Sequence, residues 1–288
     1  MMAAAAFAIL VQVLSATAAD KTPAKGAALR AACTFYASFD QGTDADVAHG
    51  DRRLYSAATL NERKDGQPGL PASGAVTIEK GAGRFGDALR FHRNVPEVVC
   101  YRIDGNLPYS QSRWNGAVSF WLKLDPNKDL EPGYCDPLFI TPRVFNDGAL
   151  WVDFSDKPPR ALRHGAIPDR HVWNPAMKDF DKIPDAERPL ASVASPPFAG
   201  DRWTHIVVSF ENFNTGKPDG VSKLYLNGKL AGSVGPREQT YTWDPHQTTA
   251  TLGINYIGLY DELAFFQRAL TAAEVAELYE QAGAMLVP

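Results

Sequence analysis

Apolar and polar residues alternate along six short segments of the chain, and each segment is bounded by Gly, Pro, Asn or Asp. Alternation with a period of two is typical of β-strands that bury one face. The segments are FYASFD (35–40), GDALRFH (86–92), GAVSFWLKLD (116–125), ALWVDFS (149–155), WTHIVVSFE (203–211) and SKLYLNG (222–228). In the third, Val118 and Phe120 fall on one face and Trp121 on the other. The pattern predicts antiparallel sheets packed on a core.

Two local motifs refine this prediction. Asn227 and Gly228 separate alternating runs in KLYLNGKLAGSV, as in a two-residue type I′ hairpin. Near the end of the chain, Thr271 and Glu274 have the spacing of a helix capping box, and apolar residues follow at helical spacing. The sequence therefore predicts an all-β chain that ends in one short helix.

Residues 155–200 interrupt the strand pattern. The segment contains eight prolines and shows little periodicity. A long stretch without regular structure inside a compact domain is uncommon, and it is usually functional or partly disordered. We expect a long Pro-rich insertion here.

Composition adds little about partners. The 288 residues include 45% hydrophobic residues, enough for a sizeable core, and the formal net charge is −4. This small, interspersed charge favours neither nucleic acid nor an anionic membrane as a partner.

The first 19 residues indicate export. Residues 1–19 combine an apolar run with small residues at its end, as a signal peptide with its cleavage site does, although a plain hydrophobic tail is the alternative. The run is too short for a transmembrane helix, and no longer apolar run follows. We expect residues 20–32 to form a spacer and the protein to be secreted, periplasmic or on the cell surface.

An exported protein can form disulfides, and the chain has three cysteines. Cys100 and Cys135 lie inside the predicted folded body, and a bridge between them would stabilise it by roughly 3 to 4 kcal/mol. The alternative is three buried thiols.

The order of the motifs resembles the laminin G-like, concanavalin A-like jelly-roll domain. The resemblance rests on SFD, GRFGDALRF, GAVSFWLKL, RWTHIVVSFE, KLYLNGKLAG and YIGLYDELAFFQRALTAAEVAELY, in that order. It implies one domain over residues 33–283, with two antiparallel sheets packed face to face. It also implies a concave face that is often used for glycans, and frequently one calcium ion.

Carboxylates in the first and last strands are the candidate calcium ligands. The resemblance places such an ion near Asp40 and Asp261, and backbone carbonyls would complete an oxygen shell. Alternatively, both side chains accept backbone N–H groups at turns.

Catalysis lacks a recognisable motif. The E-x-D-x-x-E strand pattern that would bring two carboxylates together for glycoside hydrolysis is absent. Asp261 and Glu262 are neighbours, so on a regular strand they would point to opposite faces. We therefore expect no enzymatic activity.

Aromatic and planar polar side chains are the candidates for glycan binding. Trp121, Trp151 and Asp153 alternate with core residues, so we expect them on sheet faces that point away from the core. Loop residues expected to overhang them are Arg143, Trp173 and Asn174. Packing under the long insertion is the alternative role of the two tryptophans.

These observations predict an exported, non-catalytic module that binds a polysaccharide or another glycan, or else an extracellular protein. The first alternative is an architectural or interaction module without glycan binding. A polysaccharide-active hydrolase or lyase is the second.

Overall fold

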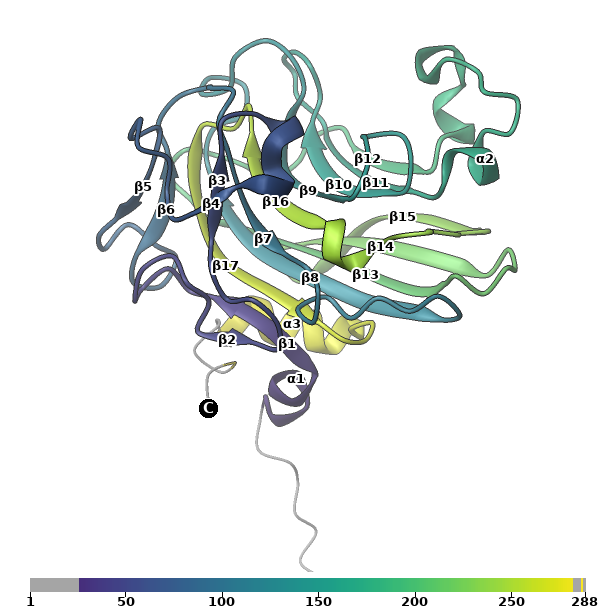
Figure 1. Cartoon of the computed structure of the whole chain (residues 1–288). Helices are drawn as coiled ribbons and strands as arrows, with labels where there is room; N and C mark the ends of the chain where they lie inside the picture. Colours follow the sequence, from purple (N-terminus) through teal and green to yellow (C-terminus); the bar gives the residue numbers. More distant parts are fainter. Residues whose placement is uncertain (1–25, 282–285, 287–288) are drawn as a thin grey trace, which may run out of the picture.

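Two antiparallel sheets pack face to face in the computed structural model, which describes residues 26–281 and 286 (Figure 1). Sheet A has the strand order β15 (Lys229–Arg237), β14 (Gly220–Leu226), β13 (Thr204–Phe213), β8 (Trp114–Lys123), β17 (Gly258–Phe266), β1 (Cys33–Ala37) and β2 (Val47–Ala48), and β6 (Ala88–Phe91) joins β5 (Val76–Glu79) to β17. Sheet B has the order β12 (Leu190–Val193), β11 (Leu162–Ile167), β10 (Ala149–Phe154), β9 (Cys135–Thr141), β16 (Thr249–Ile254), β7 (Val98–Arg102), β3 (Tyr55–Ala57) and β4 (Gln67–Pro68). Short 3₁₀ turns are η1 (Leu60–Asp65), η2 (Phe180–Lys182), η3 (Asp185–Glu187) and η4 (Pro245–Gln247). This is the predicted jelly-roll sandwich.

The main core lies between the two sheets. Phe120 on β8 and Ile206 on β13 are paired in register and fully buried, and Val152 contributes from sheet B. Trp114 packs edge-on against Phe210 and other aromatic rings at one end of the core. The alternation predicted for residues 116–125 is confirmed, because Val118 and Phe120 belong to this core whereas Trp121 does not.

Helices cover the outer face of sheet A. Leu29 of α1 (Ala27–Ala32) and Val275 and Leu278 of α3 (Ala272–Gln281) are buried in a second cluster on that face. Figure 1 shows α1 and α3 beside sheet A, whereas α2 (Arg170–Trp173) stands at the opposite side of the molecule. The outer face of sheet B is therefore the face that α1 and α3 leave open.

The predicted local motifs are confirmed. Asn227 and Gly228 have φ angles of 48° and 78°, and they close the hairpin of β14 and β15. At the start of α3, the Thr271 backbone N–H donates to Glu274 Oε2 over 2.9 Å, and the Glu274 N–H donates to Thr271 Oγ1 over 3.3 Å. All six predicted strands are present, with ends that differ by a few residues.

The expectation of an irregular insertion at 155–200 is wrong in part. Strands β11 and β12 lie within this segment and extend sheet B, with Asp153 of β10 opposite Arg163 of β11. Residues 168–189 between them form a lobe that carries α2, η2 and η3. The segment thus builds both a sheet edge and a projecting lobe. Part of the predicted spacer is also structured, since it contains α1, and residues 1–19 lie outside the described residues.

The predicted Cys100–Cys135 disulfide is wrong. Both thiols are free and buried, as is that of Cys33. Strand β16 separates β7 from β9, so the two cysteines are at least two strand spacings apart, or about 10 Å across the sheet, and they are also offset along the strands. Cys135 also faces the core between the sheets, whereas Cys100 points to the outer face of sheet B, where its thiol lies 3.6 Å from the Arg63 carbonyl oxygen. A bridge needs Cα atoms within about 7 Å.

Candidate functional site

A groove lies on the outer face of sheet B, and we name it the Trp151 groove. Its volume is about 490 Å³. The floor and rim come from sheet B and its connections, as Tyr134, Asp136, Trp151, Asp153, Arg163 and Ile254. The walls come from η1, the β9–β10 loop and the lobe, as Leu60, Phe145, Asn146 and Phe180. Aromatic and polar groups therefore meet in one cavity of a size that suits a small ligand.

Two carboxyl groups share this floor because of a β-bulge. Val152 pairs with Leu138, but Phe154 pairs with Cys135, so two residues of β9 face one residue of β10. The two residues are Asp136 and Pro137, and the single one is Asp153. Proline has no N–H to offer the sheet, which suits it to a bulge. The bulge turns Asp136 to the same face as Asp153.

Arg163 neutralises only one of the two carboxyls. Its Nε donates to Asp153 Oδ1 over 2.8 Å, and its Nη2 donates to Asp153 Oδ2. The guanidinium carbon also lies 4.5 Å from the ring centre of Tyr134 and 5.5 Å from that of Trp151. Burial raises the pKa of Asp153, and the bonds to Arg163 oppose this shift.

Asp136 has no such partner. Its side chain lines the groove although the residue is only 3% exposed, and no hydrogen bond or ion pair joins its carboxyl to another described side chain or backbone group. Burial, and then the neighbouring charge of Asp153, hold the pKa of Asp136 well above its usual range. A buried carboxyl without a partner is uncommon, so it needs an explanation.

Trp151 forms the floor because the residue opposite it is glycine. Gly165 pairs with Trp151, and a Cβ at this position would lie 2.1 Å from indole Cε2. The indole therefore lies flat across β11, and its Nε1 donates to the Phe145 carbonyl over 3.1 Å. Trp151 itself is 4% exposed, whereas Tyr134 at the rim is 48% exposed. Tyr134 is thus the aromatic ring that a ligand meets first.

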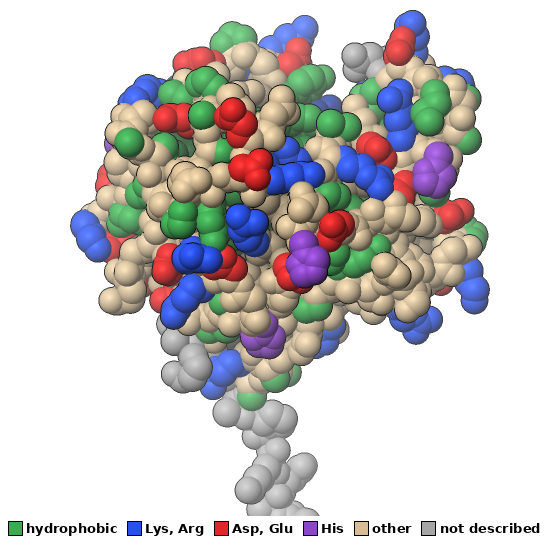
Figure 2. Space-filling model, viewed as in Figure 1, with side chains coloured by type: hydrophobic (Ala, Val, Ile, Leu, Met, Phe, Trp, Pro, Cys, Tyr) green, Lys and Arg blue, Asp and Glu red, His purple; other side chains and the backbone are tan. Residues whose placement is uncertain are grey.

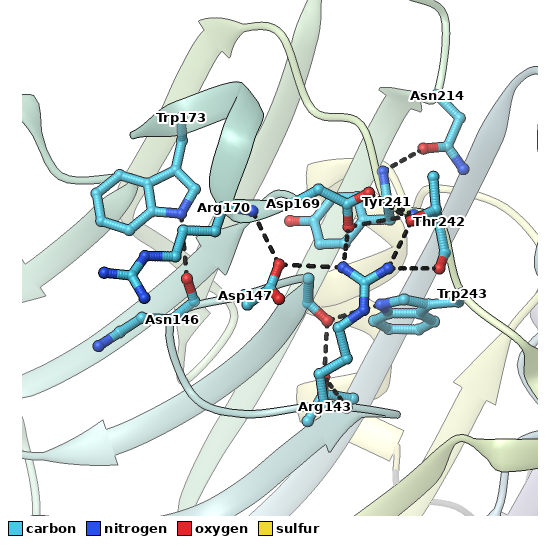
Figure 3. Close-up of polar contacts among 12 residues, drawn as sticks. Arg143, Asn146, Asp147, Asp169, Arg170, Trp173, Asn214, Tyr241, Thr242 and Trp243 are labelled. Atoms are coloured by element: carbon cyan, nitrogen blue, oxygen red, sulfur yellow. Dashed lines mark hydrogen bonds and ion pairs between the residues drawn. The ribbon is translucent and has the colours of Figure 1, made fainter. Parts of the chain in front are cut away.

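Arg143 braces the wall of the groove and does not line it. Figure 3 shows its guanidinium between Asp147, Asp169 and Thr242. Nη1 lies 2.7 Å from Asp169 Oδ1 and 3.0 Å from Asp147 Oδ1, and Nη2 donates to the Thr242 carbonyl over 2.9 Å. This network holds the β9–β10 loop, which carries Phe145 and Asn146. Arg143 is therefore a positioning residue.

Trp173 and Asn174 belong to the lobe and not to the groove. Trp173 Nε1 donates to the Asn146 carbonyl over 3.2 Å, and Asn174 closes a turn through both the carbonyl and the N–H of Lys178. Both residues line neighbouring cavities. In the space-filling view a notch separates this lobe from the rest of the molecule (Figure 2).

Trp121 and Trp151 lie on different sheets and do not share a groove. Trp121 does point away from the core, but it lies on sheet A and is 3% exposed. Its ring stacks on His205 at 4.6 Å and on Tyr279 of α3 at 5.6 Å. The amphipathic helix that the sequence predicts thus covers this tryptophan.

Asp40 and Asp261 converge on one loop, residues 83–87. Asp40 Oδ1 accepts the Asp87 N–H over 2.7 Å, and Asp261 Oδ2 accepts the Arg84 N–H over 2.6 Å. Burial, and then Glu262, raise the pKa of Asp261 to about 9. No cluster of three or more His, Cys, Asp or Glu suited to a metal is present in the described part of the chain. The calcium site stays a prediction.

Tyr134, Asp136 and Arg163 are the groove residues with aromatic or charged side chains near Asp153 that were not among the candidates from the sequence. Asp153 and Trp151 are the two predicted residues that line it. The segment CDPLFIT carries a proline, which weakens the strand signal, and Arg163 lies in the segment expected to be irregular. The apolar run LFI after Pro137 was the available sign of a buried strand.

Comparison with known families gives one match. A family model described as the concanavalin A-like lectin/glucanases superfamily matches residues 106–276, which is more than half of the chain. A search of curated protein sequences finds no match. Over residues 26–281, no helix is long and apolar enough to cross a membrane.

Solved structures share the fold at low sequence identity. The binding domain of botulinum neurotoxin DC in complex with SialylT is 9% identical, with a TM-score of 0.56, over 87% of this chain and 52% of that one. The same domain in complex with rat synaptotagmin II gives a TM-score of 0.52 at 9% identity, over 87% and 51%. Domain 4 of an extracellular arabinanase from Geobacillus stearothermophilus, in complex with arabinotriose, is 18% identical with a TM-score of 0.49, over 86% and 100%. The chain spans about half the length of the two neurotoxin chains.

Proposed function

The chain belongs to the concanavalin A-like lectin/glucanases superfamily, and on this premise we propose that it binds carbohydrate in the Trp151 groove without cleaving it. The observation that carries the proposal is the groove itself. It is a cavity of about 490 Å³ in which an exposed aromatic ring lies beside two carboxyls, a guanidinium and two asparagines. Sugar rings present apolar faces to aromatic rings and hydroxyls to planar polar groups.

Tyr134 is the ring best placed to stack on a sugar. Its exposed fraction of 48% makes it one of the most exposed large apolar side chains among the described residues. Arg163 packs over the ring at 4.5 Å, and Asn255 Nδ2 donates to the Tyr134 backbone carbonyl over 3.0 Å, so the guanidinium braces the ring and Asn255 holds the backbone that carries it. A ring fixed before binding loses little conformational entropy when a ligand stacks on it.

The contacts of Asp153 favour binding over hydrolysis. A glycosidase needs one carboxyl that protonates the leaving group and a second that acts as nucleophile or base. Both oxygens of Asp153 accept N–H groups of Arg163, so this carboxylate is engaged in a structural pair. We propose that the protein is not an enzyme. Release of reducing ends from a glycan that binds would contradict this.

We expect Tyr134→Ala to weaken glycan binding by about 5- to 30-fold, since loss of an aromatic–sugar contact removes about 1 to 2 kcal/mol. The free energy of unfolding should change little, because the ring is half-exposed. Glycan arrays identify a ligand, and titration calorimetry with wild type and variant measures the loss.

Leu230→Ala is the matched control for this variant. Leu230 is 59% exposed and lies on β15 of the other sheet. It should bind the same glycan as the wild type does. Equal losses in both variants, or none in Tyr134→Ala, would contradict glycan binding in this groove.

We further propose one structural calcium ion at the 83–87 loop. Two observations support it: the two predicted ligands, Asp40 and Asp261, meet there, and Asp261 is a buried carboxyl beside a second one. Asp40 Oδ2 accepts no hydrogen bond from a described residue and is open to a cation. Backbone carbonyls would supply the remaining ligands.

Calcium should raise the melting temperature of the protein relative to chelator. At 100 times the dissociation constant, binding adds about 2.7 kcal/mol to the free energy of unfolding. Asp40→Asn should abolish the shift, whereas Asp156→Asn, in a loop of sheet B, should keep it. A melting temperature that does not respond to calcium would leave both carboxylates as anchors of the loop.

Export also remains a proposal. It is supported by the signal-like composition of residues 1–19, which lie outside the described residues. A glycan-binding protein that is exported would meet polysaccharides outside the cell.

A further inference from the structure

We propose that the Trp151 groove selects a sugar residue that carries a positively charged amino group, and that Asp136 recognises this group. The inference rests on the carbohydrate binding proposed above and specifies its ligand. It starts from an imbalance of charge in the groove, where two carboxyls face one cation.

The one cation is already paired. Arg163 Nε and Nη2 donate to the two oxygens of Asp153. No ion pair joins Arg163 to Asp136, and among the described residues no other Lys or Arg lines the groove. A ligand with one positive charge would therefore balance the charges of the groove, which would then hold two carboxylates and two cations.

The carboxyl of Asp136 is accessible to such a ligand. The residue lines the cavity, it is 97% buried, and within residues 26–281 its carboxyl has no hydrogen-bond partner. In the free protein, burial and Asp153 raise the pKa of Asp136. A nearby ammonium favours the ionised form of a carboxyl, so a bound amino group would oppose this shift.

The surroundings of Asp136 favour a cation over an anion. Tyr134, Phe145 and Trp151 line the same cavity, and aromatic faces attract cations. An anionic sugar would instead bring a third acidic group beside two carboxyls. The basic side chains of Arg170 and Lys178 line a neighbouring cavity beyond Asn146, so the proposal concerns the single sugar residue at the Asp136 end of the groove.

The test compares three β-1,4-linked tetrasaccharides by titration calorimetry at pH 6: those of glucosamine, of N-acetylglucosamine and of glucose. All three offer similar rings, but only the first carries ammonium groups. We expect the wild type to bind the glucosamine tetramer about tenfold more tightly than the other two, since only its ammonium groups can form a cation–π contact and an ion pair in the groove.

Asp136→Asn should reduce this preference to less than about twofold. The substitution keeps the shape of the side chain and removes its charge. Asp156→Asn is the matched control: it removes one negative charge near the same end of β10, outside the groove, and the preference should persist.

The outcomes separate the two proposals. Equal wild-type affinity for the three tetramers overturns the amino-sugar assignment and leaves carbohydrate binding standing. A preference that survives Asp136→Asn, or disappears in Asp156→Asn, also overturns it. No binding to any tetramer, together with a silent glycan array, overturns both proposals. If Asp136→Asn does not fold, the affinities of the wild type for the three tetramers still test the amino-sugar assignment.

Discussion

Replacing His164 and His205 by neutral amides is expected to make the free energy of unfolding less sensitive to acid. Between pH 7 and pH 4.5 the double variant should lose about 5 kcal/mol less of this free energy than the wild type does. Burial lowers the pKa of His164 to about 4, and burial followed by the charge of Arg84 lowers that of His205 to about 3. The unfolded chain binds these protons near pH 6.5. The contribution of these two histidines to the free energy of unfolding is therefore fully present above pH 6.5, and it is lost as the pH falls towards the folded pKa values.

The magnitude of this effect follows from the difference between the pH of the measurement and the pKa of histidine in the unfolded chain. At pH 4.5 each histidine costs about 2.7 kcal/mol, which is two pH units at about 1.36 kcal/mol per unit. Both rings are held where a charge cannot be solvated. His164 Nε2 lies 2.7 Å from Ser222 Oγ and bridges the two sheets, while His205 Nε2 lies 2.8 Å from Ser119 Oγ beneath α3.

The measurement is denaturant unfolding of wild type and the double variant His164→Asn/His205→Gln at several pH values. The comparison is needed because buried acids with raised pKa, such as Asp136 and Asp261, stabilise the folded state as the pH falls. These groups act in both proteins and cancel in the difference. A difference in unfolding free energy that does not change with pH would show that neither histidine is held neutral.

Asp169→Ala is expected to lower the free energy of unfolding by about 3 kcal/mol, because it leaves buried donors without an acceptor. The Asp169 side chain is fully buried, and its oxygens accept Arg143 Nη1 at 2.7 Å and both the N–H and the hydroxyl of Thr242 at 3.0 and 2.6 Å (Figure 3). The same variant should weaken glycan binding, since the network holds the wall of the Trp151 groove.

Asp147→Ala provides the control for this prediction. Asp147 pairs with the same Arg143, but its side chain is 29% exposed and that of Arg143 is 32% exposed. Water can replace the lost carboxylate, so we expect a loss of at most about 1 kcal/mol. Equal losses in the two variants, measured by denaturant unfolding, would show that burial of Asp169 does not determine the strength of this network.

The sandwich was predictable because the local alternation of apolar and polar residues marks its strands. In residues 116–125 every second side chain enters the core, and the Asn227–Gly228 turn fixes its own hairpin. Strand β11 was not predicted because His164 faces inward between Leu162 and Ala166, and a polar residue at this position breaks the apolar alternation. What compensates the buried imidazole is Ser222 on the other sheet, which sequence spacing does not reveal.

The site was less predictable because it depends on which elements cover which face. The alternation around Trp121 and Trp151 is similar, yet α3 covers the first whereas the second lies beside an open groove. Asp136 joins the site through a bulge, and bulges shift the register that a sequence pattern assumes. Whether the Asp136 carboxyl has a hydrogen-bond partner depends on the side chains of three strands together, β9, β10 and β11.

The lobe of residues 168–189 contributes Phe180 to the wall of the groove but places few residues in the core. Apart from Asp169, whose network with Arg143 and Thr242 holds the wall of the groove, substitutions in this lobe should therefore alter the ligand wall at little cost to the stability of the sandwich. A library randomised over residues 175–188 offers a direct route to altered ligand specificity on an unchanged scaffold. The same separation makes the lobe a natural place for related proteins to diverge in what they bind.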